Sequence, residues 1–292
     1  MAPGASAQTF VLDGVDEMDF DRPESWALKY FASVTMMTGL GVPKPTEYGS
    51  IALDLELGWI PSLSEEQRRV GFVGSKDEDL NRNSVFGRLR ATFGLPRDFS
   101  ITVGVTPPIE RNGVTPRLLD LSLARPVYSS AKWRLGLRLY GQLGAIEGDF
   151  ICPEDIAGLD DPEINPDDCH EPSRDEATVD FVGLELSAAP KIWGDRWEPY
   201  LSVSGNYMDL GFQVNARYSV FDDRTKLVTD GMTFATTIGL GYAASEKLKI
   251  SGELFYSPLE VVRSPTSTKE NDGLLNVRFL FSYSFRLQLS AP

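Results

Sequence analysis

The sequence predicts an all-β fold: a membrane-spanning, antiparallel up-and-down β-barrel of about ten strands. Two observations lead to this prediction. Apolar and polar residues alternate along many segments, and the connections between these segments are alternately short and long. In residues 51–59, for example, every odd position from Ile51 to Trp59 is apolar, whereas the even positions are polar or small. Such a period of two is typical of a strand with one apolar and one polar face.

Ten segments show this alternation, and most are 10 to 14 residues long. Strands in soluble proteins are usually about 5 to 6 residues long, whereas a tilted strand that crosses a membrane needs roughly 9 to 11. The predicted strands are residues 49–60, 83–95, 98–107, 116–126, 132–145, 178–189, 198–210, 230–243, 247–259 and 273–287.

The connections alternate in length without exception. The short turns are residues 95–98, 126–131, 190–197 and 244–247, and the long connections are residues 61–82, 107–115, 146–177, 211–229 and 260–272. In an up-and-down barrel this alternation puts every short turn at one end and every long loop at the other.

Residues 1–48 do not follow this pattern. Asp21 followed by Pro23 and Glu24 is typical of a helix start, with Asp21 as the N-cap. Apolar residues then follow at helical spacing up to Gly39, at Trp26, Tyr30, Val34 and Met37. The same stretch also alternates from Leu28 to Met36, so a strand at 26–37 in a twelve-stranded barrel is the alternative. We favour a partly helical periplasmic or plug segment over residues 1–48, followed by the barrel over residues 49–292.

Two features favour an inverted barrel, in which the apolar face points outward. The polar strand faces carry mostly small residues, as in a filled or wet lumen. Aromatic residues gather near both ends of the strands, at Phe93, Phe99, Trp133, Trp193, Trp197, Tyr242, Tyr283 and Phe285 near one end and at Trp59, Tyr207 and Tyr256 near the other. Two aromatic girdles fit the two interfaces of a membrane.

On this patterning, residues 49–289 resemble bacterial outer-membrane β-barrel proteins as a class. The resemblance implies localisation in the bacterial outer membrane, a signal peptide, contact with outer-membrane lipids and lipopolysaccharide, and folding by the barrel-assembly machinery. Ala5-Ser6-Ala7 has the form of a signal-peptide cleavage site. Members of the class usually end in a strand with a terminal aromatic residue; here further residues follow Phe285, although Leu287 and Leu289 continue the outward face.

Charged residues are present on the predicted lumen side of neighbouring strands. They are the acids Asp54, Glu56, Asp120, Glu185 and Glu253 and the bases Arg88, Arg90, Arg134, Arg138 and Arg278. Opposite charges on adjacent strands attract each other. They could line a narrow pore, or they could form a salt-bridged plug. The small interior of a barrel of about ten strands favours the plug.

The long connection 146–177 contains both cysteines of the chain, Cys152 and Cys169. Two cysteines that close a short loop indicate a disulfide formed in an oxidising compartment, with two free thiols as the alternative. Residues 147–176 also hold twelve acids and one base, Arg174. This pattern predicts a solvated external loop that could attract a divalent cation, but its spacing matches no calcium-binding loop, so we predict no metal site.

The composition excludes several classes of function. A net charge of −14 does not suit nucleic-acid binding. The only histidine, His170, lies in the middle of a loop, and no nucleotide-binding or nucleophile motif is present, so we predict neither an enzyme nor a cofactor. The sequence therefore predicts a porin-like small pore or transport protein, or a structural surface barrel. A loop-mediated binding or adhesion module is the alternative, followed by a lipid-modifying enzyme.

Overall fold

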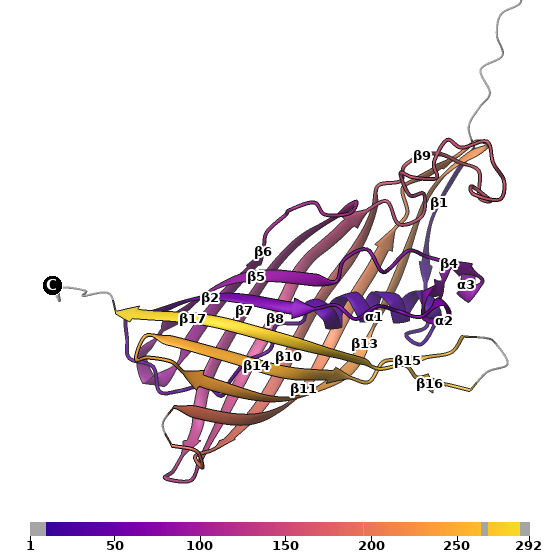
Figure 1. Ribbon diagram of the computed structural model, residues 1–292. Helices are drawn as coiled ribbons and strands as arrows, with labels where there is room; N and C mark the ends of the chain where they lie inside the picture. The colour runs from indigo at the N-terminus through magenta and orange to yellow at the C-terminus, as the bar shows by residue number, and fades with distance from the viewer. Residues whose placement is uncertain (1–9, 195, 264–267, 287–292) are drawn as a thin grey trace, which may run out of the picture.

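The computed structural model describes residues 10–194, 196–263 and 268–286, and in it ten strands form a closed antiparallel barrel (Figure 1). Each strand pairs with the next one, and pairing of the first strand with the last closes the ring. The barrel strands are β2 (Ser50–Trp59), β5 (Val85–Gly94), β6 (Ser100–Thr106), β7 (Val114–Ser129), β8 (Trp133–Gly148), β10 (Asp175–Pro190), β11 (Trp197–Gln213), β13 (Phe221–Ala243), β14 (Leu248–Ser257) and β17 (Leu274–Arg286). All ten predicted strands are present, which confirms the predicted fold class.

Apart from helix α1, described below, the remaining elements lie at the long-loop end, with one exception. They are β1 (Phe10–Glu17), α2 (Glu65–Arg68), β3 (Arg69–Val70), α3 (Gly71–Gly74), β4 (Lys76–Asp77), β9 (Cys169–Glu171), β12 (Ala216–Tyr218), β15 (Glu260–Val261) and β16 (Glu270–Asn271). The exception is the 3-10 turn η1 (Pro96–Asp98), which joins β5 to β6 at the short-turn end. β1 pairs in parallel with Phe221–Val228 of β13. This stretch of β13 lies beyond its pairing with β14, which covers Thr236–Ala243.

The barrel wall is uneven in height. β13 has 23 residues, whereas β6 has only seven. Strands β7 to β13 therefore extend beyond the others at the long-loop end, on the side where β1 lies (Figure 1).

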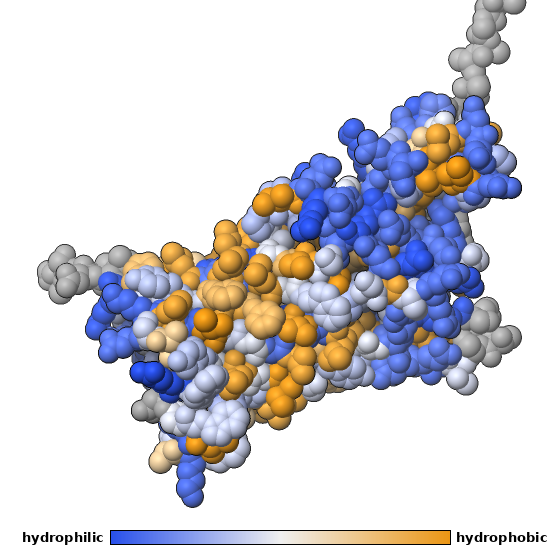
Figure 2. Space-filling view, in the orientation of Figure 1, coloured by the Kyte–Doolittle hydropathy of each residue, from blue (hydrophilic) through white to orange (hydrophobic). Residues whose placement is uncertain are grey.

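Apolar side chains cover the outside of the barrel. Leu53, Leu139, Ile238 and Phe279 are each about half exposed or more. Figure 2 shows hydrophobic residues over the wall and hydrophilic residues over the long-loop end. Exposed aromatic residues lie near both rims, among them Trp59, Trp133, Trp193, Trp197 and Tyr283. The apolar wall and the aromatic residues at both rims confirm the inverted arrangement, in which the outer face contacts lipid.

Among the described residues, no helix has the length and apolar character to cross a bilayer.

Helix α1 (Pro23–Thr35) lies inside the barrel, and 11 of its 13 residues are buried. It packs against apolar side chains that point inward from β10, β11 and β14, namely Val179, Phe181, Met208, Leu210 and Phe255. The twelve-stranded alternative is therefore wrong, because residues 26–35 are helical.

Both predicted helix boundaries need correction. Arg22, not Asp21, is the N-cap, because Pro23 occupies the first helical position directly after it. The helix ends at Thr35 and not near Gly39, since Met36 already has an extended backbone. The predicted cleavage-site residues Ala5–Ala7 and the outward residues Leu287 and Leu289 lie outside the described residues.

Candidate functional site: a filled lumen below two apolar cavities

The N-terminal segment passes through the whole lumen before the first barrel strand begins. At the long-loop end, the indole nitrogen of Trp26 donates to the carbonyl oxygen of Asp272 at 3.0 Å. At the short-turn end, the ammonium of Lys44 lies 2.9 Å from a carboxylate oxygen of Glu198. Residues 18–43 are therefore mostly buried in the interior, and residues 44–48 are mostly exposed at the short-turn end.

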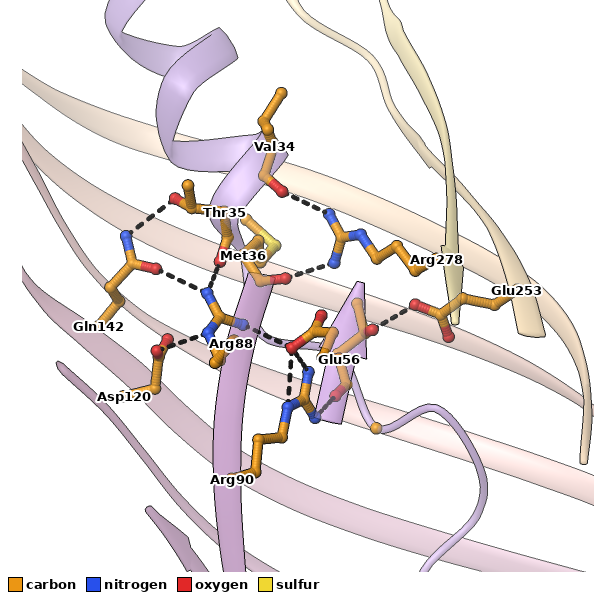
Figure 3. Close-up of polar contacts among 12 residues, drawn as sticks. Val34, Thr35, Met36, Glu56, Arg88, Arg90, Asp120, Gln142, Glu253 and Arg278 are labelled. Atoms are coloured by element: carbon orange, nitrogen blue, oxygen red, sulfur yellow. Dashed lines mark hydrogen bonds and ion pairs between the residues drawn. The ribbon is translucent and has the colours of Figure 1, made fainter. Parts of the chain in front are cut away.

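Two arginines of the wall bind the C-terminal end of α1 (Figure 3). Arg278 donates to the carbonyl oxygens of Ser33, at 2.8 Å, and of Met36. Arg88 donates to the carbonyl oxygen of Thr35. The last carbonyl groups of a helix have no partner within the helix, and a positive charge is favourable at that end. Both arginines thus act as caps for the helix inside the barrel.

Arg88 of β5 also joins an acid of β2 and an acid of β7. Its guanidinium lies 3.1 Å from Glu56 and 2.8 Å from Asp120. Arg90 binds the same carboxylate of Glu56 and donates to the carbonyl oxygen of Thr38 at 2.8 Å. Arg88, Glu56 and Asp120 are fully buried. These charges are therefore paired with one another and with the main chain of the segment that fills the lumen.

A second group of charges lies nearer the short turns. Glu253 accepts hydrogen bonds from Thr38 and from the hydroxyl of Tyr200, the latter at 3.0 Å. The backbone N–H of Gly39 donates to Glu185 at 3.2 Å, and Arg138 lies 3.6 Å from the same carboxylate.

The two remaining candidates lie on this lower part of the wall. Asp54 is buried opposite Arg90 in the β2–β5 register, and Arg134 is mostly buried and binds Glu198. The structure therefore places all ten charged residues on the lumen side. Five of them form hydrogen bonds with residues 33–39, namely Arg88, Arg90, Glu185, Glu253 and Arg278.

Sequence reasoning missed the partners of these charges on the wall. Glu198 binds Arg134, Lys44 and Lys249 at once. Gln142 donates to the hydroxyl of Thr35 at 3.1 Å. Glu198 and Lys249 lie at the ends of predicted strands, where alternation alone does not assign a face.

Above this network, the long-loop end holds two cavities of about 380 Å³ each. The mouth cavity lies between α1, β1 and the upper ends of β11 and β13, and its lining includes Leu12, Leu28, Val70, Phe212 and Leu227. The wall cavity lies between α1 and strands β2, β5 and β7, and its lining includes Tyr30, Val34, Leu55, Phe86 and Leu89.

Three side chains separate the two cavities, because Phe31, Leu80 and Phe150 line both. The Phe31 and Phe150 rings are 5.9 Å apart, and Phe150 lies 6.1 Å from the ring of Phe212. Apolar cavities of this size are typical of ligand-binding sites. Sequence reasoning did not find them, since their residues come from distant parts of the chain, from Leu12 to Leu227.

The external loop is held by the predicted disulfide, Cys152–Cys169, which is present. Both cysteines are buried beside Val214, Ala216 and Tyr218, and β9 pairs with β12. His170 is exposed on β9. Within the described part of the chain, no three acidic, histidine or cysteine side chains are arranged to hold a metal ion.

One buried acid lies in the connection between β2 and β5. Burial, aided by the charges of Asp167 and Asp175, raises the pKa of Glu78 from 4.5 to about 8, although Lys76 opposes this shift from 3.7 Å. Lys76 also pairs with Asp167 at 2.8 Å, so this group links two of the long loops.

No protein-family model and no curated protein matches the chain. Several solved structures are similar. An outer membrane channel from Pseudomonas putida F1 is 13% identical with a TM-score of 0.46, over 85% of this chain and 100% of that chain. The outer membrane protease OmpT from Escherichia coli is 13% identical with a TM-score of 0.41, over 81% and 94%. The toluene transporter TodX from Pseudomonas putida is 12% identical with a TM-score of 0.33, over 94% and 78%. At such TM-scores these likenesses say nothing about what this chain binds.

The outer and inner faces of the barrel are the features that assign the chain to a class. The apolar side chains of ten closed strands face outward, and the charged side chains face a filled lumen. This is the architecture of outer-membrane β-barrel proteins, and the chain has their fold.

Proposed function

We propose that this barrel takes up small, uncharged, apolar molecules from the external side of the outer membrane. The observation that supports the proposal is the mouth cavity, which is apolar and lies among the long loops. In outer-membrane barrels the long loops are external. A solute from outside would therefore meet this cavity first.

We also propose that residues 18–48 are a plug and that the ten charged wall residues hold it. Fully buried ion pairs such as Glu56–Arg88 are poorly suited to replace the hydration shell of an ion, because each charge already faces an opposite charge. The main chain of Thr35 and Met36 satisfies the remaining guanidinium donors. This interpretation favours a lumen that is closed along the barrel axis and disfavours a water-filled pore.

The mouth cavity, at about 380 Å³, is large enough for a small aromatic molecule with up to about three rings. An aromatic molecule that buries about 150 Å² of apolar surface gains about 4 kcal/mol, close to a millimolar dissociation constant before other costs. Binding of that strength allows release, which transport requires.

The test uses two neighbouring residues of β1. Leu12 lines the mouth cavity and Val11 does not, yet their exposed fractions are nearly equal at 41% and 43%. We expect Leu12→Glu to weaken binding of the apolar fluorescent probe N-phenyl-1-naphthylamine by roughly tenfold, because the probe would have to displace water from a carboxylate that replaces an apolar part of the lining. The matched control, Val11→Glu, should bind as the wild type does. Absence of saturable binding to the wild-type barrel would contradict the proposed function.

The proposed role involves no covalent chemistry and no cofactor. Three partners remain proposals. They are lipopolysaccharide, divalent cations that bridge it to the acidic loop, and the barrel-assembly machinery. A His170→Ala variant should take up the probe at the wild-type rate, and loss of a lipid-hydrolysing activity in that variant would favour the enzyme alternative instead.

A further inference from the structure

The hydrogen-bonded wall is interrupted near the long-loop end of β6. β5 pairs with β6 only from Leu89 to Gly94, so its residues 85–88 have no partner on that side. β7 pairs with β6 only from Leu118 onward, so its residues 114–117 also lack a β6 partner. Between these two unpaired stretches the ring of strands has a gap.

Prolines explain why β6 ends early. Pro107 and Pro108 directly follow Thr106, and proline has no N–H to donate to a neighbouring strand. Across the gap, β7 carries Pro116. The gap is closed above, because Asn83 donates to the carbonyl oxygen of Arg111 at 3.2 Å. It is therefore a window in the wall with a closed upper edge.

The wall cavity passes through this window. Its inner lining comes from Tyr30 and Val34 of α1, which lie inside the barrel. Its outer lining includes Leu55 and Leu89, whose exposed fractions on the lipid-facing side are 42% and 56%. Irregular backbone at membrane depth is tolerated where it lines a cavity.

We infer that this window is a lateral portal through which small apolar molecules pass between the mouth cavity and the hydrocarbon core of the membrane. The inference rests on the proposed function and adds the route. A molecule in the mouth cavity reaches the wall cavity by displacing Phe31, Leu80 or Phe150, the three side chains that the two cavities share.

The axial alternative is unfavourable for such a molecule. Below the wall cavity, the path is occupied by residues 36–43 and by buried pairs such as Arg90–Glu56. An apolar molecule there would separate charges from their partners without replacing those contacts, which is costly in a buried site. The lateral route leaves this network intact.

Gly87 offers a way to close the portal. It lines the wall cavity and faces outward on β5, and an added Cβ would meet its nearest atom, Leu57 Cδ2, at an ordinary 3.6 Å. Gly205 on β11 is a matched control, because it also faces outward, lies away from the wall cavity and would meet Phe234 at 3.7 Å. The variants are Gly87→Trp, with the smaller Gly87→Leu alongside, and Gly205→Trp.

Escherichia coli cells that carry each barrel in the outer membrane are mixed with N-phenyl-1-naphthylamine, and the rate of fluorescence rise is measured. Purified barrels in nanodiscs give the binding affinity, and heat-modified migration on gels verifies folding. We expect Gly87→Trp to lose the rate enhancement while it retains binding in the mouth cavity. Gly87→Leu should lose part of the enhancement, and Gly205→Trp should match the wild type.

The possible failures are distinguishable. Wild-type uptake equal to that of cells without the barrel, together with no saturable binding, would overturn the proposed function. Saturable binding with wild-type uptake in a folded Gly87→Trp barrel would overturn the portal alone. An equal loss in Gly205→Trp would also overturn the portal, because the effect would then not depend on the window.

Discussion

Arg278 of the last barrel strand donates a hydrogen bond to the carbonyl oxygen of Ser33, 2.8 Å away in the last turn of the helix inside the barrel. The wall and the segment within it are therefore joined by a fully buried charge. The ring of Phe255 lies 4.0 Å from the same guanidinium, which holds its orientation.

We expect Arg278→Met to loosen the plug. The substitution removes the charge opposite Glu253 in the β14–β17 register and leaves carbonyl groups of α1 without their donor, and each buried acceptor left unpaired costs roughly 1–3 kcal/mol. Planar-bilayer recordings should show brief openings that the wild type lacks. The exposed Arg117, paired with Glu147, provides the control Arg117→Met, which should stay closed. A folded Arg278→Met barrel that is as closed as the wild type would argue against the cap.

The second prediction concerns the lipid-facing side. Leu53, Leu137, Leu240 and Phe279 all point outward from the barrel. Fluorescent labels on single cysteines at these positions should be quenched by nitroxide groups on lipid tails in nanodiscs. A label at Asn276, which is fully buried inside, is the control and should not be quenched. Strong labelling of all four outward positions by a membrane-impermeant reagent would reject the inverted barrel.

The third prediction concerns the disulfide. Cys152 and Cys169 lie 17 residues apart within one connection, so their bond restrains no two barrel strands. A bridge of this length restricts the unfolded loop by roughly 3 kcal/mol in a simple chain model. Reduction should therefore speed proteolysis near Asp160 without altering heat-modified migration on gels. Unfolding of the barrel on reduction would contradict this expectation.

The fourth prediction concerns pH and the buried Glu78. Its pKa of about 8 in the folded protein exceeds its usual 4.5, so the folded state binds more protons between these values. Stability of the surrounding loops should therefore fall as pH rises from about 5 to about 8 and level off above. Since one pKa unit corresponds to about 1.4 kcal/mol, local opening should increase roughly tenfold or more.

Hydrogen exchange of amides in residues 76–80, corrected for the intrinsic effect of pH, measures this opening. Glu78→Gln should remove the dependence, because glutamine stays neutral. Glu65→Gln, at an exposed site in the same connection, is the matched control and should retain it. The same pH dependence in Glu78→Gln would assign the effect to another group.

The strands of the barrel were predictable because their signal is local. A strand with one lipid-facing and one lumen-facing side must alternate, and this alternation survives in every one of the ten segments. The ion pair Glu56–Arg88 was partly predictable too, since both residues lie on the lumen face of neighbouring strands.

The position of the N-terminal segment was not predictable, because it depends on contacts with distant strands. One signal was present in the sequence: α1 is apolar around much of its circumference, from Trp26 to Phe31, as buried helices are. A second was the apolar inward face of β10 at Val179 and Phe181, where a wet lumen would carry polar residues. Both indicate a packed core inside the barrel.

The parallel pairing of β1 with β13 has a consequence for assembly. Because β1 lies at the long-loop end and β2 starts at the short-turn end, the chain between them is threaded through a closed ring. If the ring closed first, β1 would have to travel end-on through it, past arginines that still lacked partners. A wall that curls around the N-terminal segment avoids this passage. The last hydrogen bonds to form, between β2 and β17, would then seal a barrel that already contains its plug.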